Sequence, residues 1–362
     1  MPFSTKSHVH PGRAGGAILL FALAYLLLAW GLAQLPLEET AFAIDWKGIW
    51  QSIQGGKIHY GPGVHNPPWS LLPILPLGFL PLVESWALLS LGTLLVMVES
   101  VPRVPNRLLY MLGVLLLISS YPAVRHLVDG NLEGVVLAGL LLLLFGYRAH
   151  HPAALAWGLL LASAKPQETW LVLPAVVVAT LRHWPGRSVL RYSAIVALVA
   201  LPLLAWYNAA WVHAVVSIEQ RGSLMDSSLI ATLTRLSAPD ALIVCAWAGV
   251  LALTLYALYT WRDDAFSPLQ AAFLVAAALM LAPYAAGNSL VTVVALGAVP
   301  LFLETPLLGL LLLAATDAQY FFSASFRYHA GASYVTAVLL LSWVTLGVYV
   351  QRRRRAQAPP SA

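Results

Sequence analysis

Long uninterrupted apolar runs restrict the fold of this chain more than any other feature. Arrays of Leu, Ala and Val longer than 15 residues recur from Ala14 to Val350. Such continuous runs are typical of transmembrane helices, whereas the strands of a transmembrane β-barrel alternate apolar and polar residues. Hydrophobic residues make up 60% of the chain and charged residues only 10%, and a soluble domain carries about 25% charged residues. The sequence therefore predicts an all-α, polytopic integral membrane helical bundle.

About twelve transmembrane or re-entrant helices are expected, because a straight span needs about 20 apolar residues. The apolar segments are 15–33, 68–98, 108–121, 131–147, 152–164, 168–182, 189–207, 240–261, 268–284, 288–303, 306–320 and 332–350. The shortest of them, such as 108–121, 152–164 and 306–320, are expected to be tilted, broken or re-entrant. The segment 68–98 is long and interrupted by prolines, so we expect a short dipping helix followed by a full span.

The positions of Lys and Arg predict the orientation in the membrane. With the N-terminus in the cytoplasm, cytoplasmic loops hold 13 of these residues and outer loops hold seven, as the positive-inside rule requires. Residues 1–14 then form a cytoplasmic tail, 15–350 the transmembrane domain with a first outer loop at 34–67, and 351–362 a basic cytoplasmic tail. We expect disorder from Arg352 onward, because this stretch has no apolar face. Its arginines are interpreted as an anchor at an anionic membrane surface and not as a nucleic-acid patch.

Polar and ionisable residues collect on the outer side in this orientation. Ionisable groups at membrane depth are costly and tend to mark functional sites. Glu133, Lys165 and Glu168 are flanked by apolar helix, which favours a functional role for them. For the residues of the longer outer loops, simple exposure to water explains the polarity equally well.

The segment after the first span places a carboxylate at the membrane boundary. Asp45 comes about a dozen residues after that span and begins a stretch with apolar residues at spacings of three and four. These apolar residues are Trp46, Ile49, Trp50 and Ile53. The spacing predicts an amphipathic helix on the outer membrane surface. Asp45 could act there as general base for a hydroxyl group or serve only as a helix N-cap, and both interpretations stay open.

Five short motifs follow one another along the chain. The first is Asp45 with Gly56, Lys57 and Tyr60, and the second is Asn66-Pro67-Pro68 with Pro76, Leu77, Leu80 and Pro81. The others are Asp129-Gly130-Asn131, Lys165-Pro166-Gln167, and Ala282-Pro283-Tyr284 with Asn288. In their order and spacing these motifs resemble glycosyltransferase family 87, bacterial polytopic enzymes of the GT-C fold that use polyprenyl-phosphate sugars. The likeness covers roughly residues 15 to 350.

The resemblance implies a cell-envelope glycosyltransferase in the bacterial inner (plasma) membrane. Such an enzyme moves one sugar, mannose or another hexose or a pentose, from a polyprenyl-phosphate donor to a lipid or glycan acceptor. Transfer takes place on the extracytoplasmic side. The charge count given above places both termini in the cytoplasm. In this fold an Asp of the first outer loop is the catalytic base, which corresponds to Asp45. Direct displacement of a phosphate inverts the anomeric centre and, unlike glycoside hydrolysis, needs no second carboxylic acid.

Substrate contacts are expected from the same motifs and from nearby cations. Lys165, Arg125 and Arg327 are candidate phosphate contacts, because cations stabilise the charge on a departing phosphate. The other expected substrate-binding residues are Tyr60, His65, Asn66, His126, Asp129, Asn131, Gln167 and Asn288. The expected partners are membrane lipids, the lipid-linked donor and the acceptor, with no nucleic acid. No metal site is expected, since no Asp-x-Asp sequence occurs and Cys245 is the only cysteine.

Two other classes of protein stay open. Both termini on one side and broken helices also suit a transporter or a lipid-linked sugar flippase. Against this class, residues 1–180 and 181–362 show no convincing repetition, and the polar groups lie on one side and not near the midplane. The third class is an accessory subunit that packs through Gly- and Ala-rich faces, and such a subunit would tolerate loss of Asp45.

Overall fold

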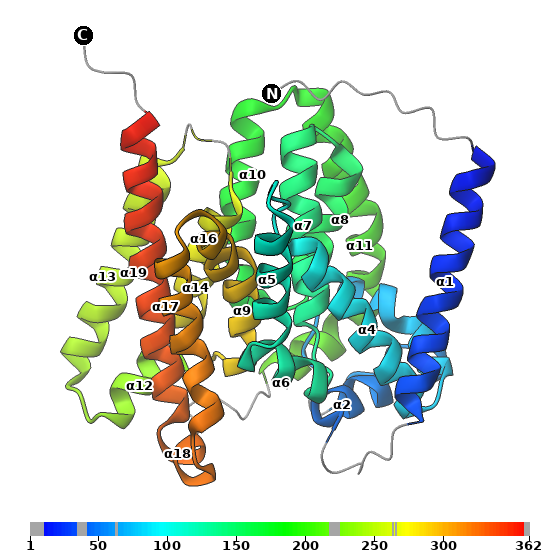
Figure 1. Cartoon of the computed structure of the whole chain (residues 1–362), viewed down its shortest axis with the longest axis horizontal. Coiled ribbons are helices and arrows are strands. Elements are labelled where there is room, and N and C mark those ends of the chain that lie inside the picture. The colour runs from blue at the N-terminus through cyan, green and yellow to red at the C-terminus, as the bar shows by residue number, and fades with distance from the viewer. Residues whose placement is uncertain are drawn as a thin grey trace.

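The computed structural model describes residues 11–34, 42–61, 64–216, 225–262, 264 and 266–357. Every regular element in these residues is a helix, and no strand occurs among them (Figure 1). The expected all-α class is therefore confirmed. Most of the N-terminal tail, residues 35–41 and 62–63 of the first outer loop, and the last residues of the basic tail lie outside the described residues.

Among the described residues, four helices are long and apolar enough to cross a membrane. They are α4 (Leu82–Ser100), α11 (Gly186–Val216), α13 (Asp240–Thr260) and α19 (Gly331–Gln357). The number rises to five if α5 (Arg107–Ile118) and α6 (Tyr121–Asp129), which meet at a bend of 54°, form one broken span. Four or five candidate spans are thus established, and the expected number of about twelve transmembrane or re-entrant helices is not confirmed.

Most remaining helices coincide with the expected apolar segments. They are α1 (Pro11–Ala33), α7 (Glu133–Ala149), α8 (Pro152–Ala162), α10 (Val172–His183), α14 (Pro268–Leu281), α15 (Leu290–Val293), α16 (Val299–Glu304) and α17 (Pro306–Asp317). Shorter elements are α2 (Ile44–Ile53), α3 (Pro68–Leu71), the 3-10 helix η2 (Leu72–Phe79), α9 (Pro166–Thr169), α12 (Leu229–Arg235) and α18 (Ala324–His329). Because α3 and η2 precede α4, the expected division of 68–98 into a short element and a full-length helix is confirmed.

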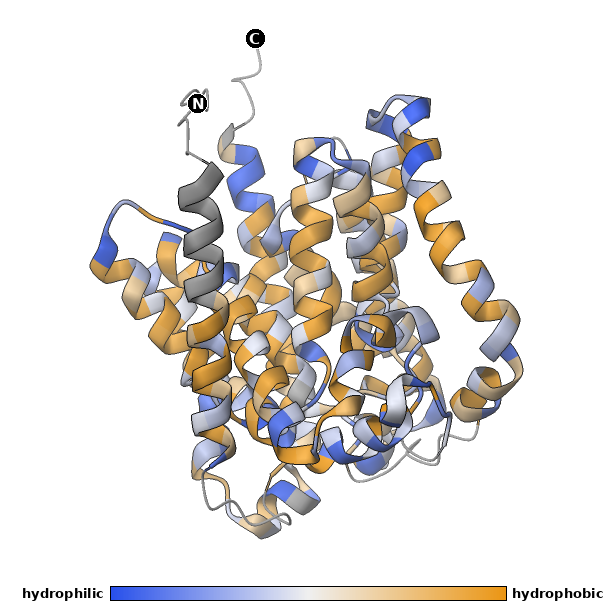
Figure 2. Cartoon of the chain, turned by 90° about the vertical axis from the view of Figure 1, so that its right-hand side faces the viewer, coloured by the Kyte–Doolittle hydropathy of each residue, from blue (hydrophilic) through white to orange (hydrophobic). Residues whose placement is uncertain are grey.

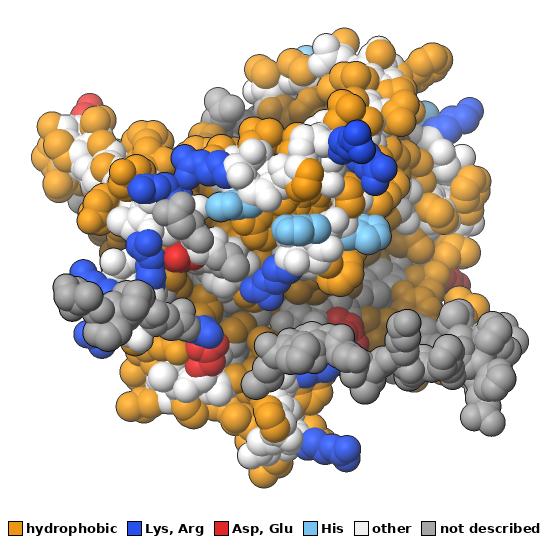
Figure 3. All heavy atoms as spheres, turned by 90° about the horizontal axis from the view of Figure 1, so that it is seen from above, with side chains coloured by type: hydrophobic (Ala, Val, Ile, Leu, Met, Phe, Trp, Pro, Cys, Tyr) orange, Lys and Arg blue, Asp and Glu red, His pale blue; other side chains and the backbone are white. Residues whose placement is uncertain are grey.

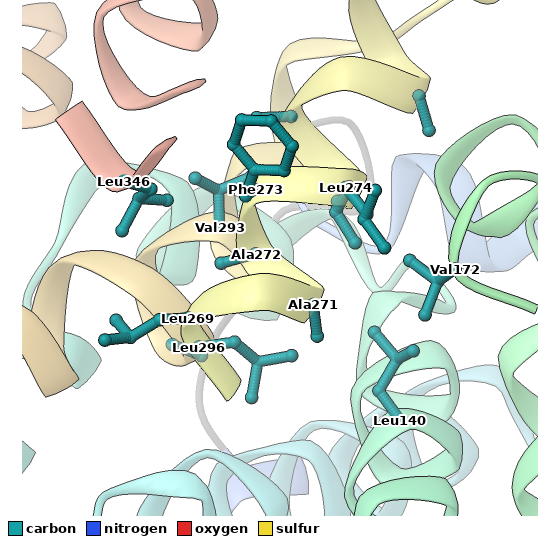
Figure 4. Close-up of a cluster of buried hydrophobic side chains, with 14 of the residues drawn as sticks. Leu140, Val172, Leu269, Ala271, Ala272, Phe273, Leu274, Val293, Leu296 and Leu346 are labelled. Carbon is teal, nitrogen blue, oxygen red and sulfur yellow. The ribbon is translucent and has the colours of Figure 1, made fainter. Parts of the chain in front are cut away.

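Helix α14 lies in the centre of the bundle, with every residue from 269 to 281 buried. Its side chains, among them Phe273, lie between Leu346 of α19 on one side and Val172 of α10 and Leu140 of α7 on the other (Figure 4). A helix that is apolar all round belongs in such a position. The helices that carry polar groups pack around it.

Glycines bring α7 and α8 close together. A Cβ atom at Gly139 would lie 2.2 Å from the backbone N of Ala162, and one at Gly158 would lie 2.4 Å from the backbone N of Leu143. Small residues at helix interfaces let two backbones approach each other in this way. The two helices therefore form a tightly packed antiparallel hairpin.

The C-terminal helix is longer than expected. Helix α19 runs to Gln357, so the expected disorder from Arg352 onward is wrong for the described residues. Arg353 Nη1 lies 2.9 Å from Glu304 Oε1, and Arg354 Nε lies 3.2 Å from Asp264 Oδ2. These ion pairs hold the last turns against other parts of the chain. Composition alone does not reveal such partners.

Polarity divides the bundle along its helix axes. Apolar residues fill the middle of the helices and hydrophilic residues gather toward their ends (Figure 2). Helices α10 and α19 end at one end of the bundle, and α2, α6 and α18 lie at the opposite end (Figure 1). Figure 3 looks onto the first of these ends and shows many Lys and Arg side chains there. We call it the basic end.

Candidate active site

Helix α2 is held against the bundle by its apolar side. Trp46 is fully buried, and its indole Nε1 donates a hydrogen bond to Ser85 Oγ of α4 at 2.8 Å. The helix is entered through Ala43, whose φ is 54° and whose backbone N donates to Val128 O of α6 at 2.8 Å. The expected amphipathic helix is present, but its apolar side does not face lipid as expected of a surface helix. Its apolar face packs on protein, because α4, α6 and η2 offer it a matching apolar surface.

A glycine at the end of α6 permits this close approach. Gly130 has a φ of 69°, in the left-handed region. A Cβ atom there would lie 2.6 Å from Trp46 Cβ and 2.9 Å from Trp86 Cδ1. Only glycine satisfies both the backbone conformation and the contact. The turn after α6 therefore places Asn131 directly beside α2.

Asn131 fixes the carboxylate of Asp45. Its Nδ2 donates to Asp45 Oδ2 at 2.6 Å, while its Oδ1 accepts from the backbone N of Leu132 at 2.7 Å. The second bond orients the amide, so Asn131 holds Asp45 in one position. Because the N-cap of α2 is Ala43, the alternative role of Asp45 as N-cap is wrong. Burial raises the pKa of Asp45, opposed in part by the Lys165 ammonium and by the Asn131 hydrogen bond.

Four buried ionisable side chains form what we call the Lys165 cluster: His126, Glu133, Lys165 and Glu168. Glu133 has a partner on each oxygen, because Oε1 pairs with Lys165 Nζ and Oε2 lies 2.8 Å from His126 Nδ1. Glu168 Oε1 lies 3.9 Å from Lys165 Nζ. Glu133 and Glu168 are fully buried, His126 is 1% exposed and Lys165 is 8% exposed. Charges at such depth persist only when they are paired.

The charge of Lys165 is maintained by its neighbours. Burial alone lowers the pKa of this amine, but the carboxylates of Glu133 and Glu168 act in the opposite direction, and the net pKa is raised. Lys165 is therefore a fixed ammonium ion whose charge acts on Asp45. The sequence had singled out Lys165, Glu133 and Glu168 as buried ionisable candidates, and the structure brings the three together.

Local bonds direct Lys165 toward α7. The residue lies in the turn between α8 and α10, where Pro166 begins α9. Asn66 Nδ2 donates to the carbonyl of Ala164 at 2.8 Å, and Thr169 Oγ1 donates to the carbonyl of Ala162 at 3.0 Å. These bonds close the turn on both sides of Lys165. Asn66, expected to bind substrate, thus also supports the position of the ammonium.

Helix α6 contributes several of the expected residues together. Arg125 Nη2 lies 2.9 Å from Asp129 Oδ2, one turn apart on this helix. His126 of the same helix is buried against Glu133, and Asn131 follows in the turn. Arg125, His126, Asp129 and Asn131 therefore lie on one continuous segment beside Asp45.

Two expected residues of the first outer loop connect it to other elements. Tyr60 OH donates to the carbonyl of Asn66 at 2.9 Å. His65 Nδ1 lies 2.9 Å from the carbonyl oxygen of Ala214 in α11. Both residues border the segment that supports the turn at Lys165. Gln167, two residues after Lys165 in the sequence, is partly buried in α9.

Arg327 and Asn288, both expected to bind substrate, are not brought to the Lys165 cluster by any described contact. Arg327 is exposed on α18 and donates to the carbonyl of Phe322 at 3.0 Å. No contact among the described residues joins it to the Lys165 cluster, and α18 lies apart from α2 (Figure 1). Asn288 lies in the 3-10 turn before α15, and its side chain is outside the described part of the chain.

Two hydroxyl residues of the cluster were not expected. Ser289 Oγ donates to Glu133 Oε1 at 3.4 Å, and Thr292 Oγ1 donates to Glu168 Oε2 at 3.3 Å. Both are fully buried at the start of α15. Their signal in the sequence was two hydroxyl residues at the start of the apolar segment 288–303, which alone does not show which helix face they occupy.

The bundle is all-helical and contains apolar candidate spans, which define a membrane protein. Its buried acid–base cluster is a polar site at the end of the bundle opposite the basic end. The model of Glycosyltransferase family 87 matches residues 65–285, which is more than half of the chain. The chain therefore belongs to glycosyltransferase family 87 and is a membrane glycosyltransferase, as its motifs predicted. The match includes the Lys165 cluster and Asn131, whereas Asp45 precedes it and Asn288 and Arg327 follow it. No curated protein and no solved structure matches the chain at a significant level.

Proposed function

We propose that this glycosyltransferase moves a hexose or pentose from a polyprenyl-phosphate donor to a hydroxyl group of a lipid or glycan acceptor, with Asp45 as general base. The observation that supports this proposal most directly is the 2.6 Å bond from Asn131 to Asp45, which orients a partly buried carboxylate on which the charge of Lys165 acts. A general base must be held within reach of the proton it removes. Asn131 and Gly130 supply that constraint.

The proposed step is a single displacement. The acceptor oxygen forms a bond to the anomeric carbon of the sugar while the bond from that carbon to the phosphate oxygen breaks. Asp45 accepts the proton of the acceptor hydroxyl group, and the electron pair of the broken bond stays on the polyprenyl phosphate that leaves. One displacement inverts the anomeric centre. General-base catalysis of this kind contributes about 10²- to 10⁴-fold in rate.

Lys165 is proposed to stabilise the departing phosphate. An ammonium ion has three N–H donors, and Glu133 engages it directly. The buried Glu133 carboxylate keeps it charged and in place, so little reorganisation is needed when negative charge develops on the phosphate. Arg125, whose side chain is 41% exposed, is the proposed second phosphate contact.

The position of the site supports transfer on the extracytoplasmic side. Asp45 lies on α2, at the end of the bundle opposite the basic end (Figures 1 and 3). The positive-inside rule assigns the basic end to the cytoplasm. We therefore propose an inner-membrane enzyme with both termini in the cytoplasm and its acceptor in the outer leaflet or beyond.

The proposal is tested with purified protein in lipid nanodiscs. A panel of polyprenyl phosphates carrying mannose, other hexoses or pentoses is supplied with a membrane lipid extract as acceptor, and release of free polyprenyl phosphate is measured. We expect acceptor-dependent release from one donor class. Asp45→Asn should reduce this rate by about 10²-fold or more without weakening donor binding.

Asp240→Asn is the matched control, because Asp240 is exposed in the first turn of α13. It should leave the rate unchanged. A rate near that of the wild type in Asp45→Asn refutes Asp45 as the base. If the folded protein releases polyprenyl phosphate from none of the donors but moves a lipid-linked sugar across sealed vesicles, the chemistry proposed here is wrong and transport replaces it.

A further inference from the structure

A hollow on the outside of the bundle shares no lining residue with the Lys165 cluster, and its inner end at Trp170 and Leu171 directly follows the α9 turn that carries Glu168. It has a volume of about 430 Å³ and runs between α10 and α13, over the residues that precede and begin α14. Its walls are apolar, with Ala175 and Val178 from α10 and Leu255 and Leu258 from α13. Val178 is 49% exposed and Leu255 is 50% exposed. In a membrane-embedded bundle a hollow with such exposed apolar walls opens toward the hydrocarbon of the bilayer.

One end of this hollow carries positive charge. Arg182 in the last turn of α10 and Arg262 just after α13 both line it, and both are exposed. No hydrogen bond or ion pair of Arg182 is present among the described residues. The Arg262 guanidinium lies 4.1 Å from the ring centroid of Tyr259. Among the described residues that line this end, the acidic one is Asp264, which is paired with Arg354 at 3.2 Å, so Arg182 offers a positive charge to a ligand.

The hollow fits one leaflet in position and length. Its charged end coincides with the basic end of the bundle, where α10 ends (Figures 1 and 3). Leu171, at its other end, is 11 residues before Arg182, which corresponds to about 16 Å of helix. The hydrocarbon of one leaflet is about 15 Å deep, half of a bilayer core. The polar and apolar ends are therefore spaced like the headgroup and chain of a single lipid.

We propose that this hollow binds an anionic phospholipid from the leaflet at the basic end, with an acyl chain between α10 and α13 and the phosphate on Arg182. Arginine is well suited to phosphate because of its planar, multiply donating guanidinium. A zwitterionic lipid would bring its own cation to this end, and an apolar protein helix would leave Arg182 without an anion. The proposed reacting phosphate of the donor binds Lys165, which does not line the hollow, so a phosphate on Arg182 is a different one and this proposal does not depend on the proposed reaction.

Native mass spectrometry tests the proposal on the full chain in detergent micelles. Phosphatidylglycerol and phosphatidylcholine are titrated separately, and the fraction of protein with one bound lipid is measured. We expect phosphatidylglycerol to bind more tightly. Arg182→Gln should weaken it about fivefold, since one basic residue near a membrane surface contributes about 1 kcal/mol. Val178→Trp fills the hollow with a larger side chain. It should weaken the binding of phosphatidylglycerol and of phosphatidylcholine, and the melting temperature of the protein should stay unchanged.

Arg187→Gln is the matched control, because Arg187 is exposed at the start of α11 near the same end but does not line the hollow. It should bind phosphatidylglycerol as the wild type does. Equal weakening in Arg182→Gln and Arg187→Gln shows nonspecific attraction and overturns the proposal, as does equal binding of the two lipids. A polyprenyl phosphate that co-purifies and depends on Arg182 also overturns it, because the occupant is then not a phospholipid.

Discussion

The ion pair between Glu133 and Lys165 yields a prediction about stability that can be worked out from burial alone. Glu133 is fully buried and Lys165 is 8% exposed, so removal of either partner leaves the other charge in a place that water does not reach. Breaking a buried pair in this way costs about 3–5 kcal/mol, whereas replacing both charges by apolar or neutral groups costs far less. We therefore expect Lys165→Met and Glu133→Gln each to lower the free energy of unfolding by about 3–5 kcal/mol.

The double variant separates this explanation from simple loss of packing. In Glu133→Gln/Lys165→Met both charges of the pair are removed together, so the loss should be smaller than the sum of the single losses by about 2–3 kcal/mol. Unfolding is followed by tryptophan fluorescence as SDS is added to mixed micelles. The exposed pair Glu99–Arg103, 3.3 Å apart, is the control, and its double-mutant cycle should give less than about 1 kcal/mol. Additive losses at Glu133 and Lys165, or losses as small as those of the control, refute the reasoning.

Three further predictions concern the position of Asp45. A general base must be ionised, and burial raises the pKa of Asp45. The transfer rate should therefore rise with pH through a pKa above the usual range of an aspartate. A pH–rate profile without such an acid limb contradicts the role of Asp45 as a base with a raised pKa. Asn131→Leu removes a bond that lowers this pKa, so the acid limb should move to higher pH and the rate at neutral pH should fall about tenfold or more, as for a lost bond to a charged group. Gly130→Ala places a Cβ atom 2.6 Å from Trp46 on a residue in the left-handed conformation, which should cost about 2–4 kcal/mol of stability and displace α2. The control is Gly48→Ala in α2, which should cost nothing because no atom lies within 4 Å of its new Cβ. Equal unfolding midpoints for the two variants would disprove the close contact at Gly130.

The helices of this protein could largely be predicted from its sequence, because each expected apolar segment contains a helix. The segment 68–98 is an example, with its prolines breaking a short dipping element from α4. The number of membrane crossings could not be derived in the same way. Bends such as the 54° angle between α5 and α6 depend on tertiary packing, and apolar content does not show whether a helix spans the membrane or ends within it.

The site was predictable in its residues but not in its pairings. Lys165, Glu133 and Glu168 were identifiable because ionisable groups inside apolar segments are rare and costly. Their contacts depend on the rotation of α7 against the turn after α8, which glycines such as Gly139 set through backbone contact. The bond from Asn131 to Asp45 joins residues 86 positions apart, and no local periodicity encodes it. The burial of Trp46 on protein instead of lipid followed from the same long-range docking.

The tight hairpin of α7 and α8 has a consequence for how this protein enters its membrane. Glu133 begins the first helix of the hairpin and Lys165 follows the second, so the hairpin brings both charges to the same end. An ionised residue that is buried at membrane depth is costly unless it is paired. A hairpin that inserts with its two charges already paired avoids part of that cost for both. Synthesis of residues 133–165 as one unit thus delivers the ammonium of the site together with its counter-ion, before the second carboxylate, the imidazole or α2 needs to be in place.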